Sequence, residues 1–258
     1  MIKKDGPSGD VFLDIVEKYP GEDVIALDSL GWHFLVASPH LLADLFVHKC
    51  YDFSKPRRAG AFIRRVVGQG LVTAEEDEHK FLRKNTMPAF HMRHIMDLYP
   101  MMWSKGSILT RTLTREVTSE DGEGQVVELG PWASKVTLDI IGIAGMGRAL
   151  NTVEKASDPL QETFGNLLAP DPEKVLFGVM SLTIGYPTVR MLPWKINKWF
   201  IDLTATLNSI TRERIKEKRE AMRTKADDHF DILSLLIKSN NFDDEVLKDQ
   251  LLTFLSAG

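Results

Sequence analysis

The chain has 258 residues, of which 43% are hydrophobic and 26% charged, and its formal net charge is −4 at pH 7. This composition excludes a wholly disordered chain, and the acidic balance predicts no nucleic-acid partner. A single cysteine excludes a disulfide framework, and no apolar stretch of membrane-spanning length occurs near the amino end. Residues 1–9 are mostly polar and predict a tail, which leaves residues 10–258 as one domain.

The first part of this domain predicts a short helix and a small β element. Residues 10–19 place their apolar side chains on one side of a helix. Residues 24–30 and 32–37 are two short runs typical of strands, joined near Gly31. Pro39 then favours the start of another helix, and Cys50 near its end is typical of a small apolar side chain.

The stretch from Gly70 to Phe90 predicts a turn, a charged helix and a stop at Pro88. Thr73 and Glu76 have the spacing of a capping box, which predicts Thr73 as the N-cap. Acidic residues fill the first helical turn and basic residues follow them, as the helix dipole favours.

His79 and Arg83 are the two residues of this helix with a candidate binding role. They are four residues apart and therefore share one helix face. Together they offer hydrogen-bond donors to an anion such as a carboxylate. The same spacing also fits an ordinary solvated helix, so the pattern by itself leaves both interpretations open.

The rest of the chain is mostly helical, apart from a strand predicted over residues 126–129 and an apolar loop predicted over residues 170–193. The glycines near residue 145 do not follow a strand, so they favour a helix end over a phosphate-binding loop. The predicted helices cover residues 91–117, 131–146, 158–169, 194–222, 231–239 and 243–258.

Two segments carry a resemblance to a known family. Residues 70–90 closely resemble the C-helix region of the cytochrome P-450 superfamily of haem-thiolate monooxygenases, and residues 243–258 resemble the start of its I helix. The resemblance extends over nearly the whole chain and is closest to eukaryotic, fungal-like members. The matching C-helix residues are Gly70, Leu71, His79, Arg83, Pro88, Ala89 and Phe90.

The resemblance implies a mainly α fold, the amino-terminal part of the cytochrome P-450 fold, with a small β element near the amino end and truncated within the I helix. It also implies a haem cofactor. His79 and Arg83 would hydrogen-bond a haem propionate, while Ala257 and Gly258 would lie beside the haem on the I helix.

The resemblance also implies a substrate pocket for a small hydrophobic organic molecule. Residues 57–70 would form the B–C region, which covers this pocket in the family. Ala61, Phe62 and Ile63 in this region, and Phe254 on the last helix, are the candidate pocket residues. Ordinary loop packing is the alternative for the first three residues.

Members of the family insert one oxygen atom from O2 into an organic substrate. Their Glu-x-x-Arg pair follows the I helix, whereas the Glu-x-x-Arg spacing of this sequence, Glu220 to Arg223, precedes the segment that resembles it. Their Cys-containing haem loop does not occur in this sequence, and no glycine-rich loop surrounds Cys50. We therefore assign no catalytic residue and no metal ligand, and we expect the chain alone to be inactive. A non-enzymatic binding or interaction module derived from the fold is the alternative.

The family also implies partners and a location. Eukaryotic members reside in the endoplasmic reticulum membrane and receive electrons from a reductase. The apolar region over residues 175–187 is either a peripheral membrane contact or a segment packed on the core. Because later helices of the family are absent from the sequence, we expect Leu251, Phe254 and Leu255 to lack packing partners.

Overall fold

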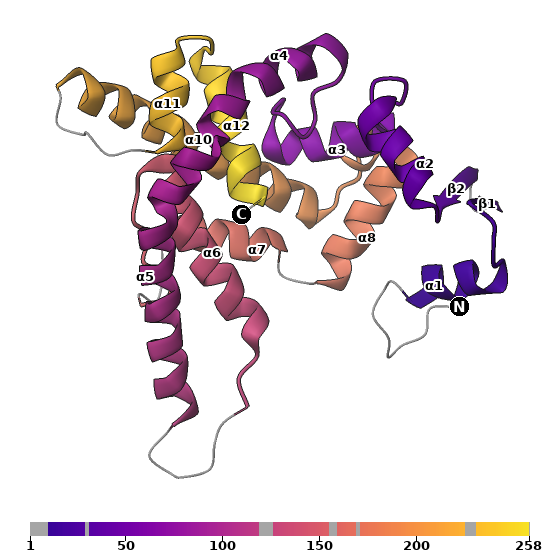
Figure 1. The fold of residues 1–258 in the computed structure, drawn as a ribbon, viewed down its shortest axis with the longest axis horizontal. Helices are drawn as coiled ribbons and strands as arrows, with labels where there is room; N and C mark the ends of the chain where they lie inside the picture. The colour runs from indigo at the N-terminus through magenta and orange to yellow at the C-terminus, as the bar shows by residue number, and fades with distance from the viewer. Residues whose placement is uncertain are drawn as a thin grey trace. The chain divides into compact units, whose positions relative to one another are not determined.

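The computed structural model describes residues 10–28, 31–118, 126–154, 159–168, 171–224 and 231–257. The described residues are mostly helical (Figure 1), which confirms the predicted fold class. The chain forms two compact units, residues 1–55 and residues 56–258, and each is described separately. The single domain over residues 10–258 stays a prediction.

The first unit contains the predicted helix and the predicted β element. Strands β1 and β2 pair antiparallel, with Val24 opposite Val36 and Asp28 opposite Trp32. Helix α2 starts at Pro39, whose missing N–H is not needed at a helix start, and continues into a short π-helix, η1. The elements are α1 (Asp10–Lys18), β1 (Val24–Asp28), β2 (Trp32–Val36), α2 (Pro39–Ala43) and η1 (Asp44–His48).

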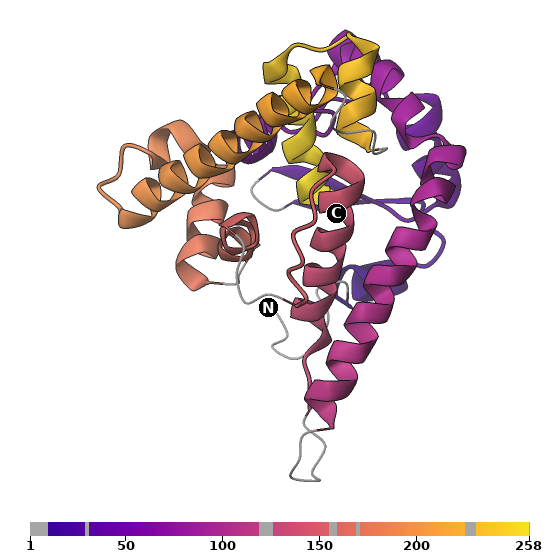
Figure 2. The same cartoon turned by 90° about the vertical axis from the view of Figure 1, so that its left-hand side faces the viewer.

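All secondary-structure elements of the second unit are helices, among its described residues. Helices α5 and α6 lie side by side, and α10 lies against α12, as both views show (Figures 1 and 2). Its elements are α3 (Arg57–Val67), α4 (Glu76–Thr86), the 3-10 helix η2 (Met87–Phe90), α5 (Met92–Val117), α6 (Leu129–Met146), α7 (Pro159–Leu168), α8 (Pro172–Met180), the π-helix η3 (Ser181–Gly185), α9 (Tyr186–Val189), α10 (Lys195–Arg223), α11 (Ile232–Ser239) and α12 (Asp244–Ala257).

Helix α12 lies in the middle of the main core of this unit. It contacts α3, α6, α10 and α11, and its apolar side chains join theirs in one hydrophobic cluster. Leu251, Phe254 and Leu255 are only 2%, 7% and 3% exposed. The expectation that these three residues lack packing partners is therefore wrong, because helices distant in sequence cover them.

A junction of three helices supports this core through buried polar contacts. The ammonium group of Lys218 on α10 lies 2.5 Å from the carboxylate of Asp231, and the two side chains are 1% and 0% exposed. Asp231 also caps α11 by accepting a hydrogen bond from the Ser234 N–H. Gly147 ends α6 in the left-handed conformation, with Arg214 donating to the last carbonyl groups of that helix.

A second, smaller cluster lies where α3 meets the segment from α8 to α10. It contains Phe177, Tyr186 and Phe200, and Phe62 of α3 packs on all three rings. The rings of Phe62 and Phe200 are stacked, 5.6 Å apart and 11° from parallel. The Arg58 guanidinium adds a hydrogen bond to the carbonyl of Thr183 in η3.

Three local predictions are wrong. Residues 57–67 form the helix α3, and residues 172–189 form α8, η3 and α9, where loops were expected. Aromatic and arginine contacts between these two segments stabilise both, and such contacts leave no short-range pattern in the sequence. Residues 126–128 are not a strand, and α6 already begins at Leu129.

We expect Leu251→Ala to destabilise the chain by about 2–5 kcal/mol, because it leaves a cavity in the middle of the main core. Urea unfolding followed by circular dichroism measures this change. Met96→Ala is the control, since Met96 is exposed on α5, and it should change stability by about 0.5 kcal/mol or less. Equal midpoints for the two variants would contradict the central place of α12.

The surface of α10 and α12 predicts an acid-sensitive contribution to stability. Arg212 donates two hydrogen bonds to Glu245, at 2.9 and 3.0 Å, and Lys248 donates a third at 2.7 Å. These bonds lower the pKa of Glu245 from its ordinary value of 4.5 to about 2. Because the folded pKa is the lower one, the stabilisation is complete above pH 4.5 and is lost as the pH falls towards 2.

Glu245→Gln tests this assignment. The Glu245 side chain is 60% exposed, so solvent screening limits the effect to about 0.2–1 kcal/mol at pH 6 and low salt. The difference in unfolding free energy between wild type and Glu245→Gln should shrink as the pH falls from 4.5 towards 2, because the unfolded chain takes up the proton of Glu245 first. A difference that widens at acidic pH would rule out this ion pair as its origin.

Candidate cofactor-binding face

Helix α4 carries the two predicted binding residues. It begins at Glu76, after Glu75 in an extended conformation, and no side chain caps it. The prediction of Thr73 as N-cap is wrong: Thr73 is buried, and its hydroxyl donates to the carbonyl of Gly68 at 2.7 Å. This hydroxyl therefore holds the turn before the helix, and Glu76 enters the helix at φ = 49°.

His79 and Arg83 lie one helical turn apart on α4, His79 half-buried and Arg83 exposed. Lys80 on the same helix is engaged with Asp77 at 2.8 Å. The structure gives the Arg83 side chain no hydrogen bond or ion pair with any residue that it describes. Its guanidinium therefore keeps a complete set of donors for an external anion.

The same face of α4 continues into polar and apolar groups. Thr86 lies three residues after Arg83, and its buried hydroxyl has no hydrogen-bond partner among the described residues. Further on, the exposed ring of Phe90 meets Phe254 of α12 edge to face, with ring centroids 5.2 Å apart. A cation, an unpaired hydroxyl and an aromatic edge thus follow one another from α4 into η2.

These groups fit the carboxylate-bearing edge of haem, which presents negative propionates beside a large apolar ring. Arg83 and His79 would hold a propionate, and Phe90 and Phe254 would contact the ring. The only cysteine of the sequence, Cys50, belongs to the other compact unit, and neither α4 nor α12 contains a cysteine. The fit concerns the propionate side of the cofactor.

The other predicted cofactor residues lie at the end of α12. Ala257 is its last residue and is exposed, whereas Gly258 lies outside the described residues. Their role beside a haem stays a prediction.

The four predicted pocket residues lie in different surroundings in the described part of the chain. Ala61 and Ile63 are exposed on α3, and Phe62 is part of the smaller aromatic cluster. Phe254 belongs instead to the main core around α12. The pocket role of these four residues stays a prediction, and the main contacts of Phe62 are with other rings of the protein.

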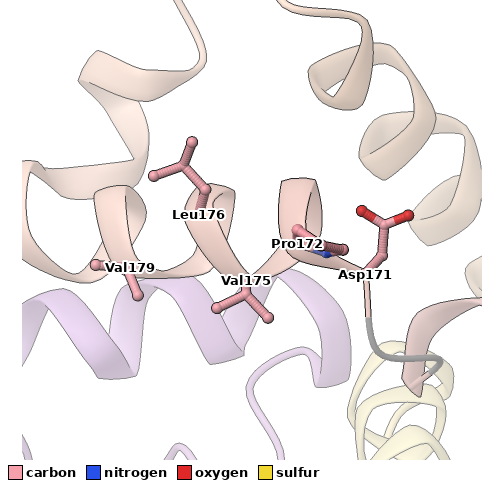
Figure 3. Close-up of a pocket in the computed structure, with 5 residues that line it drawn as sticks. All are labelled: Asp171, Pro172, Val175, Leu176 and Val179. Carbon is pink, nitrogen blue, oxygen red and sulfur yellow. The ribbon is translucent and has the colours of Figure 1, made fainter. Parts of the chain in front are cut away.

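A separate apolar hollow of about 500 Å³ lies along α8. Figure 3 shows Val175, Leu176 and Val179 along this helix, with Pro172 and Asp171 at its amino end. The Asp171 carboxylate caps the helix by accepting the N–H groups of Glu173 and Lys174. Since all five lining residues come from one helix and its cap, the hollow is an open apolar surface.

Among the described residues, no helix combines the length and the apolarity that crossing a bilayer requires.

Comparisons with known proteins agree with the resemblance seen in the sequence. A profile of the cytochrome P450 family matches residues 25–258. The cytochrome P450 monooxygenase sphH of Aspergillus fumigatus is 37% identical over 228 residues, covering 86% of this chain and 42% of that protein. The cytochrome P450 monooxygenase ALT8 of Alternaria alternata is 33% identical over 249 residues, covering 87% of this chain and 42% of that protein.

A third relative, the cytochrome P450 monooxygenase FUM15 of Gibberella moniliformis, is 32% identical, covering 87% of this chain and 39% of that protein. The chain thus spans about two fifths of the length of these curated relatives. The match covers most of the chain at more than 30% identity and includes α4 and α12. The chain therefore belongs to the cytochrome P450 family.

Proposed function

We propose that this chain supplies the propionate-binding side of a haem site in a monooxygenase. The whole enzyme inserts one oxygen atom from O2 into a small hydrophobic organic substrate, with electrons from a reductase. The observation that carries the proposal is Arg83, which is exposed, has no partner among the described residues and follows His79 by one turn. The family of the chain supplies the identity of the anion.

The residues of α4 act by binding and orienting. Arg83 presents a planar fork of N–H donors, which matches the two oxygens of a carboxylate. His79 adds a ring donor from the previous turn. Phe90 and Phe254, whose rings pack edge to face, would cover the apolar edge of the haem ring and keep water away from it. Haem with an axial thiolate supplies the oxygen chemistry of this class of enzyme.

The end of α12 and the exposed side of α3 complete the proposed site. Ala257, the last residue of α12, and Gly258 are the proposed contacts of the I helix with the cofactor. Ala61 and Ile63 expose their side chains and are free to contact substrate, while Phe62 packs within the smaller aromatic cluster and Phe254 within the main core. These assignments rest on the membership of the chain in the cytochrome P450 family.

The chain alone does not carry out turnover under this proposal, because Cys50 lacks the surroundings of a haem-ligating cysteine. A second candidate, a non-enzymatic binding module derived from the same fold, is favoured by one observation. The core around α12 is closed, with Leu251 and Leu255 buried, as a separately folding piece requires.

Helix α8 is the proposed membrane contact. Val175, Leu176 and Val179 are exposed apolar residues that follow one another along the helix (Figure 3). An apolar helix surface of this kind lies in a bilayer interface without spanning it. This placement fits an enzyme of the endoplasmic reticulum membrane.

Arg83→Ala tests the propionate contact. Hemin should bind the variant about 3- to 10-fold more weakly than wild type, because a charge-assisted contact at an exposed site is worth about 1 kcal/mol. Hemin dimethyl ester, whose propionates are blocked, should bind both proteins equally. Titrations followed by absorbance measure both affinities.

Lys84→Ala is the matched control, since Lys84 is an exposed cation of the same helix outside the face of His79 and Arg83. It should leave hemin affinity unchanged. Equal affinities for Arg83→Ala and Lys84→Ala would remove the propionate assignment.

The absence of a thiolate ligand has its own spectroscopic test. The hemin complex of this chain, reduced and exposed to carbon monoxide, should lack the red-shifted absorbance band of a thiolate-ligated haem. Cys50→Ala should give the same spectrum as wild type. A thiolate band that disappears in Cys50→Ala would show that Cys50 binds iron.

A further inference from the structure

The turn between α3 and α4 lies so close to α12 that only glycine fits at two of its positions. A Cβ atom on Gly68 would lie 2.0 Å from the Asp249 carboxylate, and one on Gly70 would lie 2.1 Å from the Thr253 hydroxyl. Gly68 also has φ = 70°, a left-handed conformation that favours glycine. The turn that leads into α4 is thus seated directly on α12.

Asp249 fastens this turn to α12. Its Oδ2 accepts the backbone N–H of Gln69 at 2.7 Å, and its Oδ1 lies 3.1 Å from the ammonium group of Lys248. The Asp249 side chain is only 15% exposed, so water competes little for these contacts. The carboxylate therefore fixes the backbone of the turn through a short, charge-assisted hydrogen bond.

Gln69 carries the connection onward to α4. Its side-chain amide donates to both carboxylate oxygens of Glu78, each at 2.7 Å. Glu78 precedes His79 in the first half of α4. On the other side of the turn, Thr73 donates to the Gly68 carbonyl, and Arg64 donates to the Thr73 carbonyl. Hydrogen bonds therefore lead from α12 through Gln69 to α4, the helix that carries His79 and Arg83.

We propose that Asp249 is a positioning residue for His79 and Arg83, which sets α4 against α12 through Gln69 without touching the cofactor itself. The inference rests on the proposed function, because it concerns the binding of a haem propionate by those two residues. Another carboxylate of α12 makes a different contact, since Asp244 pairs with Arg219 on α10 at 2.7 Å. Of these two carboxylates of the described α12, only Asp249 contacts the turn.

Hemin titration of the full chain tests this inference with Asp249→Ala, Asp249→Asn and Asp244→Ala. Asp249→Ala should weaken hemin binding about threefold to fivefold, because the turn loses the acceptor that orients α4. Asp249→Asn keeps an oxygen acceptor for the Gln69 N–H and should stay within about twofold of wild type. Asp244→Ala removes the same charge from the same helix and should leave the affinity unchanged.

The double variant Asp249→Ala/Arg83→Ala separates positioning from general destabilisation. If Asp249 acts through Arg83 and His79, the double variant loses less affinity than the product of the two single losses. Losses that multiply would overturn the inference, as would an unchanged affinity in Asp249→Ala. If Arg83→Ala itself binds hemin like wild type, the proposed function fails, and this result is distinct from the failure of Asp249→Ala alone.

Gln69→Ala keeps the test decisive if Asp249→Ala fails to fold. Gln69 is exposed, so truncating its side chain removes only the link to Glu78 and leaves the core intact. A folded Gln69→Ala protein should show weaker hemin binding that is again non-additive with Arg83→Ala. A folded Gln69→Ala protein with wild-type affinity would contradict the proposed connection.

Discussion

The buried ion pair between Lys218 and Asp231 is the constraint on which the second unit depends. Neither charge reaches water, so each is stable in the core only beside the other. The pair joins α10 to the start of α11, and Gly147 at the end of α6 lies against it without room for a side chain: its Cβ would lie 2.7 Å from Asp231. Three helices from distant parts of the sequence thus meet at a single point.

Together with α3, these three helices surround α12. Because their positions are fixed at the junction, they cover the apolar side of α12 and leave its other side to the turn before α4. The site on α4 is therefore positioned by contacts that begin far from it. The core around α12 is well packed, with Leu247 and Leu251 among its buried members, and it includes no charge from the site.

Long periodic segments were predictable from the sequence, and short segments stabilised at a distance were not. The bounds of α5, α10 and α12 follow from helical spacing, and the end of α4 follows from Pro88; neither signal needs tertiary information. Helix α3 escaped prediction because much of its support comes from aromatic rings more than a hundred residues away. Thr73 was misassigned because its spacing suits a cap, yet the buried turn offers its hydroxyl a nearer carbonyl.

The candidate site shows the same division. His79 and Arg83 are recognisable because four-residue spacing on a charged helix is a local pattern. The contact between Asp249 and Gln69 is not recognisable, because the two residues are 180 positions apart. An aspartate within a charged helix turn is ordinarily read as a solvated charge. The burial of Leu251 and Leu255 was not predictable either, because α6 and α10 cover them. No pattern within residues 243–258 can reveal those contacts.

The stacked rings of Phe62 and Phe200 have a consequence for how this protein can change over evolutionary time. Close-packed interiors tolerate substitutions that conserve total volume far better than single enlargements. Two nearly parallel rings in contact share one space, so a bulkier residue at position 62 is accommodated only by a smaller one at position 200. Positions 62 and 200 are far apart in the sequence, yet they should vary together across related sequences.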